Sequence, residues 1–364
     1  MKITFRVDAS LEMGTGHVMR CLTFANALKE QGTECHFICR EHPGNLIPQL
    51  TQQGHKVHTL AYSTAATAPA NTEHPLAHAA WLGSSQATDA DLCQAIIETT
   101  QPDWLIVDHY ALDIQWEKAL RPYCKKLMVI DDLADRQHDC DLLLDQTFGR
   151  APKDYLPLVP QDCQLLCGSE YALLRPEFAQ WRDYSLKRRE QGQLEHLLIN
   201  LGGVDKNNIT SQILKALANS PLPKNCHITV VMGATAPWVE EVKHQAAQLP
   251  WPTQVKVGVS NMAELMANSD LAIGAAGATS WERCCLGLPT IMVVLADNQK
   301  LIAKGLQAVG AALFLDKQHI NDNELTRSVA VLTSSPSKVL GMSNSAAKVS
   351  DGRGVELILQ QMEL

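Results

Sequence analysis

Apolar residues in the first half of the chain recur with two alternating periods. Short apolar runs such as 104–107 are typical of buried strands, whereas residues 17–31 repeat apolar side chains every three or four positions, as one face of a helix does. Alternation of the two patterns across short connections predicts βαβ units and a parallel sheet. The predicted strands are 2–8, 33–39, 55–60, 104–108 and 126–131, and the predicted helices are 17–31, 44–53, 89–100 and 113–121.

The alternation restarts after a less regular stretch at 141–180. Within that stretch, residues 141–145 resemble a last strand of the first sheet. The second half predicts strands at 195–201, 226–232, 253–258, 270–274 and 289–294, and helices at 208–219, 237–247, 261–268, 279–287, 298–309, 322–333 and 353–362.

Two successive doubly wound halves predict an α/β fold of two Rossmann-like domains that face each other across a cleft, where a ligand is expected. We expect an N-terminal domain at 1–160 and a C-terminal domain at 161–364 that includes the last helices, with a boundary inside 155–180. Residues 61–80 are rich in Ala, Thr and Pro and predict a surface excursion.

Composition narrows the class of protein. The chain has 364 residues, of which 46% are hydrophobic and 19% charged, as in soluble globular proteins. A net charge of −8 argues against a broad nucleic-acid surface. No run of 18 apolar residues is present, and the N-terminal residues resemble a strand more than a signal peptide. We therefore expect a cytoplasmic protein without membrane or nucleic-acid partners; its oligomeric state stays open, with a monomer compatible.

Eleven scattered cysteines form no Cys-x-x-Cys pair. Cys35 and Cys39 lie on a predicted strand beside His36, but a zinc site would need two further ligands at suitable spacing. Reduced, buried thiols and no metal are the expectation.

The segment from Gly274 to Glu282 is the first candidate site. A short apolar strand runs into a small-residue turn at Gly277, and a helix begins at Thr279 and Ser280. Free backbone N–H groups at such a turn suit a phosphate. Glu282 is placed to accept two hydrogen bonds from a ribose diol. The alternative is an ordinary capped helix in which Glu282 only complements the helix dipole.

The loop after the first predicted strand is the second candidate. It contains Gly14-Thr-Gly16-His17 and lies at the carboxyl edge of the sheet, where ligands of open α/β sheets bind. At a helix N-terminus the His17 imidazole should favour its neutral form, which can accept a proton. A capping or packing histidine is the alternative.

Polar residues also follow the next two strands. Asp108 is suited to orienting a neighbour and Tyr110 to donating to a substrate oxygen, although ordinary loop polarity accounts for both. Asp131 and Asp132 resemble a metal-binding pair; we favour turn or helix caps.

These segments together resemble the UDP-2,4-diacetamido-2,4,6-trideoxy-β-L-altropyranose hydrolases of bacterial pseudaminic acid synthesis. The resemblance spans almost the whole chain. Its C-terminal part is shared with two-Rossmann-domain (GT-B) glycosyltransferases, including the peptidoglycan N-acetylglucosaminyl transferase. The motifs are Arg6-x-Asp8-x-Ser10, Gly14-x-Gly16-His17-x-x-Arg20, Val107-Asp108-x-Tyr110, Asp131-Asp132, Gly168-x-x-Tyr171-Ala-Leu-Leu-Arg175, Leu201-Gly-Gly203-x-Asp205, Gly277-x-Thr-Ser-x-Glu282 and Asn298-Gln299.

The resemblance implies that UDP lies on the C-terminal domain and the sugar faces the N-terminal one. His17 becomes the general base that activates water at the anomeric carbon, Tyr110 and Asn298 complete the catalytic set, and Glu282 holds the ribose. Val204 stands where a small polar residue is expected, which leaves one phosphate contact open. The further implied substrate-binding residues are Gly16, Arg175, Gly203, Met262, Gly277, Thr279, Ser280 and Gln299.

The implied reaction is hydrolysis of the UDP-sugar to UDP and free sugar, with inversion and without a metal or cofactor. A histidine base contributes ~10²–10⁴-fold, and backbone donors meet the charge on the leaving phosphate. Two alternatives remain: a UDP-sugar glycosyltransferase of the same fold, and a non-catalytic nucleotide-sugar-binding protein.

Overall fold

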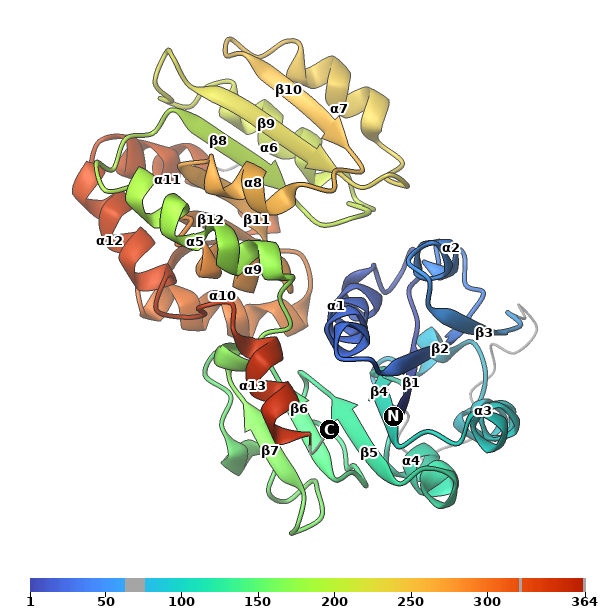
Figure 1. Cartoon of the computed structure of the whole chain (residues 1–364). Helices are drawn as coiled ribbons and strands as arrows, with labels where there is room; N and C mark the ends of the chain where they lie inside the picture. Colours follow the sequence, from blue (N-terminus) through green and yellow to red (C-terminus); the bar gives the residue numbers. More distant parts are fainter. Residues whose placement is uncertain (63–75, 321–322, 363–364) are drawn as a thin grey trace. The chain divides into compact units, whose positions relative to one another are not determined.

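The computed structural model describes residues 1–62, 76–320 and 323–362, except for the side chain of Asn298. The chain divides into two compact units. One contains residues 1–173 together with 355–364, and the other contains 174–354. Each unit is a parallel β-sheet covered by helices (Figure 1).

The sheet of the first unit is parallel throughout, in the order β3-β2-β1-β4-β5-β6-β7. The chain therefore reverses its direction of travel across the sheet between β1 and β4, which are neighbours, with Val7 opposite Asp108. Loops that follow these two strands meet at the carboxyl edge of the sheet. The strands are β1 (Lys2–Val7), β2 (Glu34–Arg40), β3 (Lys56–Leu60), β4 (Trp104–Asp108), β5 (Lys126–Ile130), β6 (Leu142–Asp145) and β7 (Gln164–Cys167).

Helices cover both faces of this sheet, so most of its strands are almost continuously apolar. On one face α1 and α2 pack over β1 and its neighbours, around Phe5, Phe24 and Phe37, and α13 adds to the same core nearer β6 and β7. On the other face α3 and α4 contribute Ile97 and Trp116 to a second core. The helices of this unit are α1 (Gly16–Glu30), α2 (Ile47–Gln52), α3 (Gln86–Thr100), α4 (Ile114–Leu120) and α13 (Gly354–Gln361), with 3₁₀ turns η2 (Ala79–Leu82), η3 (Arg121–Tyr123), η4 (Pro152–Asp154) and η5 (Ser169–Tyr171).

The second unit repeats this architecture, with parallel strand order β10-β9-β8-β11-β12-β13. Its crossover lies between β8 and β11, so the loops after these strands share one edge. The strands are β8 (His196–Asn200), β9 (His227–Met232), β10 (Thr253–Val257), β11 (Leu271–Ala275), β12 (Thr290–Val294) and β13 (Ala312–Asp316).

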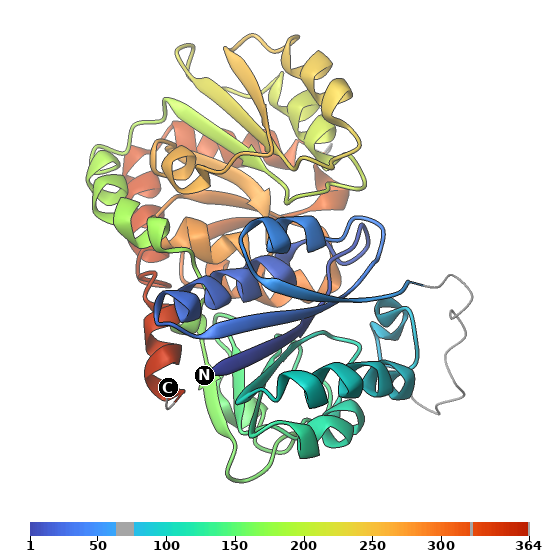
Figure 2. The ribbon, with the colours of Figure 1, turned by 45° about the vertical axis from the view of Figure 1, so that its right-hand side comes forward.

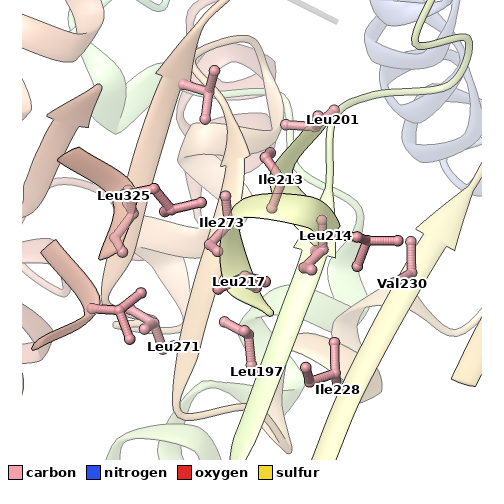
Figure 3. Close-up of a cluster of buried hydrophobic side chains, with 14 of the residues drawn as sticks. Leu197, Leu201, Ile213, Leu214, Leu217, Ile228, Val230, Leu271, Ile273 and Leu325 are labelled. Carbon is pink, nitrogen blue, oxygen red and sulfur yellow. The ribbon is translucent and has the colours of Figure 1, made fainter. Parts of the chain in front are cut away.

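The core of the second unit forms where α6 packs on the sheet (Figure 3). Ile213, Leu214 and Leu217 of α6 are buried among side chains from β8, β9 and β11, such as Leu197 and Ile273. The helices of this unit are α5 (Pro176–Arg188), α6 (Ile209–Leu217), α7 (Val239–Ala246), α8 (Met262–Ala267), α9 (Thr279–Cys285), α10 (Lys300–Ala308), α11 (Glu324–Thr333) and α12 (Pro336–Ala346), with η6 (Asp297–Gln299) and η7 (Lys317–His319).

The periodic segments are confirmed as the predicted strands and helices, with ends shifted by a few residues. Four elements were not predicted: β7, α5, β13 and α12. Residues 141–145 therefore contain a strand, β6, but not the last of the first sheet, because β7 pairs beside it. The expected excursion at 61–80 lies partly outside the described residues, and its described end at 76–78 leads into η2.

The structure divides the chain elsewhere than at the expected 160/161 boundary. Strand β7 completes the first sheet, which moves the boundary to 173/174, inside the wider expected window. The expectation that all the last helices belong to the C-terminal domain is wrong for α13. Its Ile358 and Met362 are buried in the core of the first unit, beside β6 and β7 (Figures 1 and 2).

All eleven cysteines are free thiols, and the expectation that they are buried is confirmed for nine of them. Burial raises the pKa of Cys35 to about 12. Within the described ranges, no helix is both long and apolar enough to cross a bilayer.

The packing of α13 gives a stability prediction. Ile358→Ala removes a fully buried side chain and should lower the free energy of unfolding of the first unit by about 2–5 kcal/mol. Gln360→Ala, on the exposed side of the same helix, should change it by less than about 0.5 kcal/mol. Chemical denaturation of the full chain measures both, and equal effects would show that α13 is not part of this core.

Candidate functional site

The loop that delivers His17 is held in shape by its own residues. Ser10 and Gly14 exchange backbone hydrogen bonds of 3.3 and 2.8 Å, and Gly14 has φ +78°. The Ser10 hydroxyl also accepts the amide of Met13 at 3.0 Å. The chain then enters α1 at Gly16, so His17 lies at the beginning of that helix, at the carboxyl edge of β1.

The structure brings His17 and Asp108 together. The Nδ1 atom of His17 lies 2.6 Å from Oδ1 of Asp108, whose side chain is fully buried. Burial alone would raise the pKa of Asp108, but the charges of Arg20 and His17 outweigh it and hold that pKa well below its usual range. Asp108 is therefore a carboxylate and accepts the Nδ1 proton. The hydrogen bond engages Nδ1 of His17 and leaves its Nε2 atom outside the pair.

Arg20, one helical turn after His17, connects this pair to the next strand end. It donates twice to Asp108, from Nε and Nη2 at 2.7 Å each, and from Nη1 to Asp132 at 2.6 Å. Oδ2 of Asp132 also accepts the Tyr110 hydroxyl at 2.6 Å. Five side chains, from α1, from the end of β4 and the loop after it, and from the loop after β5, thus form one connected network.

This network changes the expected part of Tyr110. Burial and the charge of Asp132 raise the pKa of Tyr110 well above its usual value, so the hydroxyl stays protonated. It donates its hydrogen bond to Asp132. Tyr110 contacts His17 with its ring, whose centroid is 4.5 Å from that of the imidazole, at an interplanar angle of 85°. Donation to a substrate oxygen would require the hydroxyl to leave Asp132.

Asp131 and Asp132 have different environments. Asp131 caps a turn by accepting the amides of Leu133 and Ala134, at 3.1 and 2.8 Å, which confirms the capping interpretation for this residue. Asp132 joins the network around His17. Within the described part of the chain, no group of three or more His, Cys, Asp or Glu side chains is arranged to hold a metal ion.

Sequence reasoning missed an aromatic wall beside His17, formed by His78, Trp81 and Tyr110. Trp81 lies 5.9 Å from Tyr110, nearly parallel to it, and 6.4 Å from His17; His78 lies 4.3 Å from Trp81. Both residues come from η2 and the residue before it, at the end of the Ala/Thr/Pro-rich stretch. No motif signals them, because only the packing of η2 brings them to His17.

In the second unit, the turn after β11 exposes backbone donors. Among the described residues, the amides of Gly277, Ala278 and Thr279 have no hydrogen-bond acceptor, whereas that of Ser280 bonds to Gly277. A Cβ on Gly277 would meet only Nε2 of Gln299, at 4.0 Å, so the space above the turn is open. Gln299 is fixed through Oε1, which accepts the amide of Leu295 at 3.0 Å.

The hydroxyl of Ser280 does not face this space. Its side chain is fully buried, and its oxygen accepts from Nη2 of Arg283 at 3.3 Å. Thr279 is half-buried and accepts from Nη1 of Arg283 at 3.0 Å. The hydroxyl of Ser280 is therefore not placed to contact a ligand, and Ser280 contributes only to the shape of the turn.

Glu282 follows in the first turn of α9 and is half-buried. Burial raises its pKa to about 7, and the opposing charges of Arg175 and Arg283 compensate only in part. Arg175 precedes α5 and pairs with Glu177 at 2.9 Å. A half-buried carboxyl with such a shifted pKa is typical of binding sites.

The other expected residues occupy the same unit. Gly203 lies in the loop after β8, whose neighbour in the sheet is β11, so its loop shares the edge of the Gly277 turn. Met262 begins α8. The backbone of Asn298 belongs to η6, directly before Gln299, but its side chain lies outside the described residues.

Comparison with known proteins identifies the fold class. Residues 197–358 match the glycosyltransferase family 28 C-terminal domain. The whole chain resembles the solved structure of MurG from Acinetobacter baumannii, with a TM-score of 0.71 at 16% identity, covering 100% of this chain and 99% of that one. The predicted fold class of two Rossmann-like α/β domains of the GT-B type is thereby confirmed; the predicted cleft between them stays a prediction.

Relatives by sequence confirm the resemblance inferred from the motifs. The chain is 26% identical to the UDP-2,4-diacetamido-2,4,6-trideoxy-beta-L-altropyranose hydrolase of Campylobacter jejuni, covering 85% of this chain and 97% of that protein. It is 24% identical to the uncharacterised protein MJ1062 of Methanocaldococcus jannaschii, covering 88% of this chain but only 63% of that longer protein.

The raised pKa of Glu282 predicts a pH-dependent stability cost. Between pH 4.5 and about 7 the folded protein binds a proton at Glu282 that the unfolded chain has lost, so this residue costs stability as pH rises through that window. Glu282→Gln should therefore gain on the order of 1–3 kcal/mol relative to the natural protein between pH 5 and pH 8. Urea denaturation at both values tests this; a difference independent of pH would contradict it.

Proposed function

We propose that this protein hydrolyses a UDP-linked 2,4-diacetamido-2,4,6-trideoxy sugar to UDP and the free sugar, in pseudaminic acid biosynthesis. The observation that carries the proposal is the pair of His17 and Asp108, which holds the imidazole through Nδ1 and keeps Nε2 out of that bond, at the carboxyl edge of the first sheet. Support comes from the Campylobacter hydrolase, which the chain matches over 97% of that protein's length.

The N-terminal unit supplies the chemistry on water in this proposal. Nε2 of His17 accepts a proton from a water molecule as the water oxygen attacks C1 of the sugar. Asp108 stabilises the imidazolium that forms, because its carboxylate is buried and fixed at 2.6 Å from Nδ1. The ring of Tyr110 and the aromatic wall exclude bulk water around the base.

The C-terminal unit holds the nucleotide. The free amides of the Gly277 turn and Nε2 of Gln299 donate to the diphosphate, and ionised Glu282 accepts from the ribose diol. As the C1–O bond breaks, its electron pair goes to the β-phosphate oxygen, and UDP leaves as an anion. No general acid or divalent cation is needed in this scheme, and a single displacement inverts C1.

A transferase is the second candidate, because residues 197–358 match a glycosyltransferase domain and the fold is that of MurG. Water and an acceptor hydroxyl would use the same base, so the two functions differ in what reaches C1. The decisive difference is turnover in the absence of any acceptor.

Purified protein incubated with the UDP-linked diacetamido-trideoxy sugar and no acceptor should release UDP and free sugar over many turnovers. ¹H and ³¹P NMR follow both products, and the first-formed anomer reports inversion. Excess EDTA should leave the rate unchanged. Release that stops at a small fraction of one turnover, and resumes when an acceptor is added, would establish the transferase.

His17→Ala should lower kcat by at least about 10²-fold, while UDP affinity measured by calorimetry stays within about twofold, because the imidazole acts on water and not on the nucleotide. His58→Ala, a histidine of β3 that pairs with His36, is the matched control and should keep wild-type kcat. An alanine variant of His17 that retains more than about a tenth of kcat would exclude the general-base role.

A further inference from the structure

The strongest unexplained feature is a buried cation under the Gly277 turn. Arg283 is 2% exposed, yet among the described residues no carboxylate forms an ion pair with it, and its Nε atom has no hydrogen-bond partner. Burial lowers its pKa only to about 10, so it is charged at neutral pH. Its neighbour Glu282, with a pKa of about 7, is only partly ionised there and neutralises it incompletely. Uncompensated buried charge is costly.

The guanidinium folds back beneath the turn, and the turn is built to accommodate it. Nη2 donates to the carbonyl of Ala275 at 2.6 Å and Nη1 to the hydroxyl of Thr279 at 3.0 Å. A Cβ on Gly274 would lie 2.5 Å from Nη1, so only glycine fits at that position. Gly274 is thus explained by Arg283, and not by the backbone conformation of the turn.

A second buried arginine of the same unit shows what an ordinary structural role involves. Arg189 is 1% exposed and donates to the carbonyls of Leu286 and Gly287, which lie just after the last residue of α9. Those carbonyls favour a cation. Arg283 instead donates to the hydroxyl of Thr279, the first residue of the same helix, where the positive end of the helix dipole disfavours a cation. In the unliganded protein, the electrostatics there are unfavourable and a bound anion would relieve them.

We infer that Arg283 is the positioning residue that makes the Gly277 turn selective for the diphosphate of the ligand. This rests on the proposed function, which puts UDP on this unit. Its charge attracts the anion from below. By donating to the oxygen of Thr279, Arg283 also leaves the threonine proton free to be donated upward, to a phosphate oxygen. The same charge stabilises UDP as it leaves.

Calorimetry with UDP, UMP and uridine tests this on the full-length protein. Arg283→Met should lower UDP affinity by about 10–100-fold, lower UMP affinity less, and leave uridine affinity unchanged. Arg283→Lys, which keeps the charge but not the forked geometry, should lower UDP affinity less than Arg283→Met does. Thr279→Val should lower UDP affinity alone, and should add little in the Arg283→Met background, since the arginine orients the hydroxyl.

Arg189→Met is the matched control and should preserve the ratio of UDP to uridine affinity. A folded Arg283→Met variant with the wild-type ratio would overturn the inference. If that variant does not fold, wild-type ratios in both Arg283→Lys and Thr279→Val would overturn it equally. Failure of the proposed hydrolysis is a separate outcome: the wild type would then release no UDP from the sugar nucleotide, while its UDP affinity would still depend on Arg283.

Discussion

The carboxylate of Asp108 is the group on which the first candidate site depends. It is fully buried, and it stays ionised because Arg20 donates to both of its oxygens and His17 lies at 2.6 Å. Without that carboxylate, Nδ1 of His17 would lose its partner, and Arg20 would keep its bond to Asp132 but lose two others. The pairing of β1 with β4 brings Asp108 to the loop that delivers His17, so the chemistry follows directly from the strand order.

The candidate site of the second unit also depends on a buried charged group, here a cation. Arg283 lies under an open turn and Glu282 beside it, and burial moves the pKa of each toward its neutral form. Such groups lower the stability of an unliganded protein and are retained where a ligand compensates them. In the proposed reaction, the carboxylate network acts on water through His17, and the buried cation acts on the anionic leaving group.

Much of the fold could be predicted because most strands are buried on both faces and most helices are amphipathic. The failures have physical causes. Strand β7 has only four residues, and α12 begins at Pro336, directly after Ser334 and Ser335, in a sequence that resembles a loop. Helix α13 was assigned to the wrong unit because an apolar helical face shows that it is buried, but not against which core.

The site could be predicted as far as the carboxyl-edge rule extends, which covers His17, Asp108, Tyr110 and the Gly277 turn. The position of Arg283 could not be predicted, because an arginine in a helical pattern is expected to be exposed. Only the structure shows that its side chain folds back under Gly274. Trp81 and His78 were missed for a related reason: their neighbours in space are distant in sequence.

The central claim is that water activated by His17 attacks the sugar carbon and not the phosphorus. Hydrolysis in ¹⁸O-labelled water tests it most directly, with UDP examined by mass spectrometry because free sugars exchange their anomeric oxygen with solvent. The account predicts UDP without label, since the C1–O bond breaks and the phosphate keeps its own oxygens. Label in the β-phosphate of UDP would show attack at phosphorus and would contradict the account.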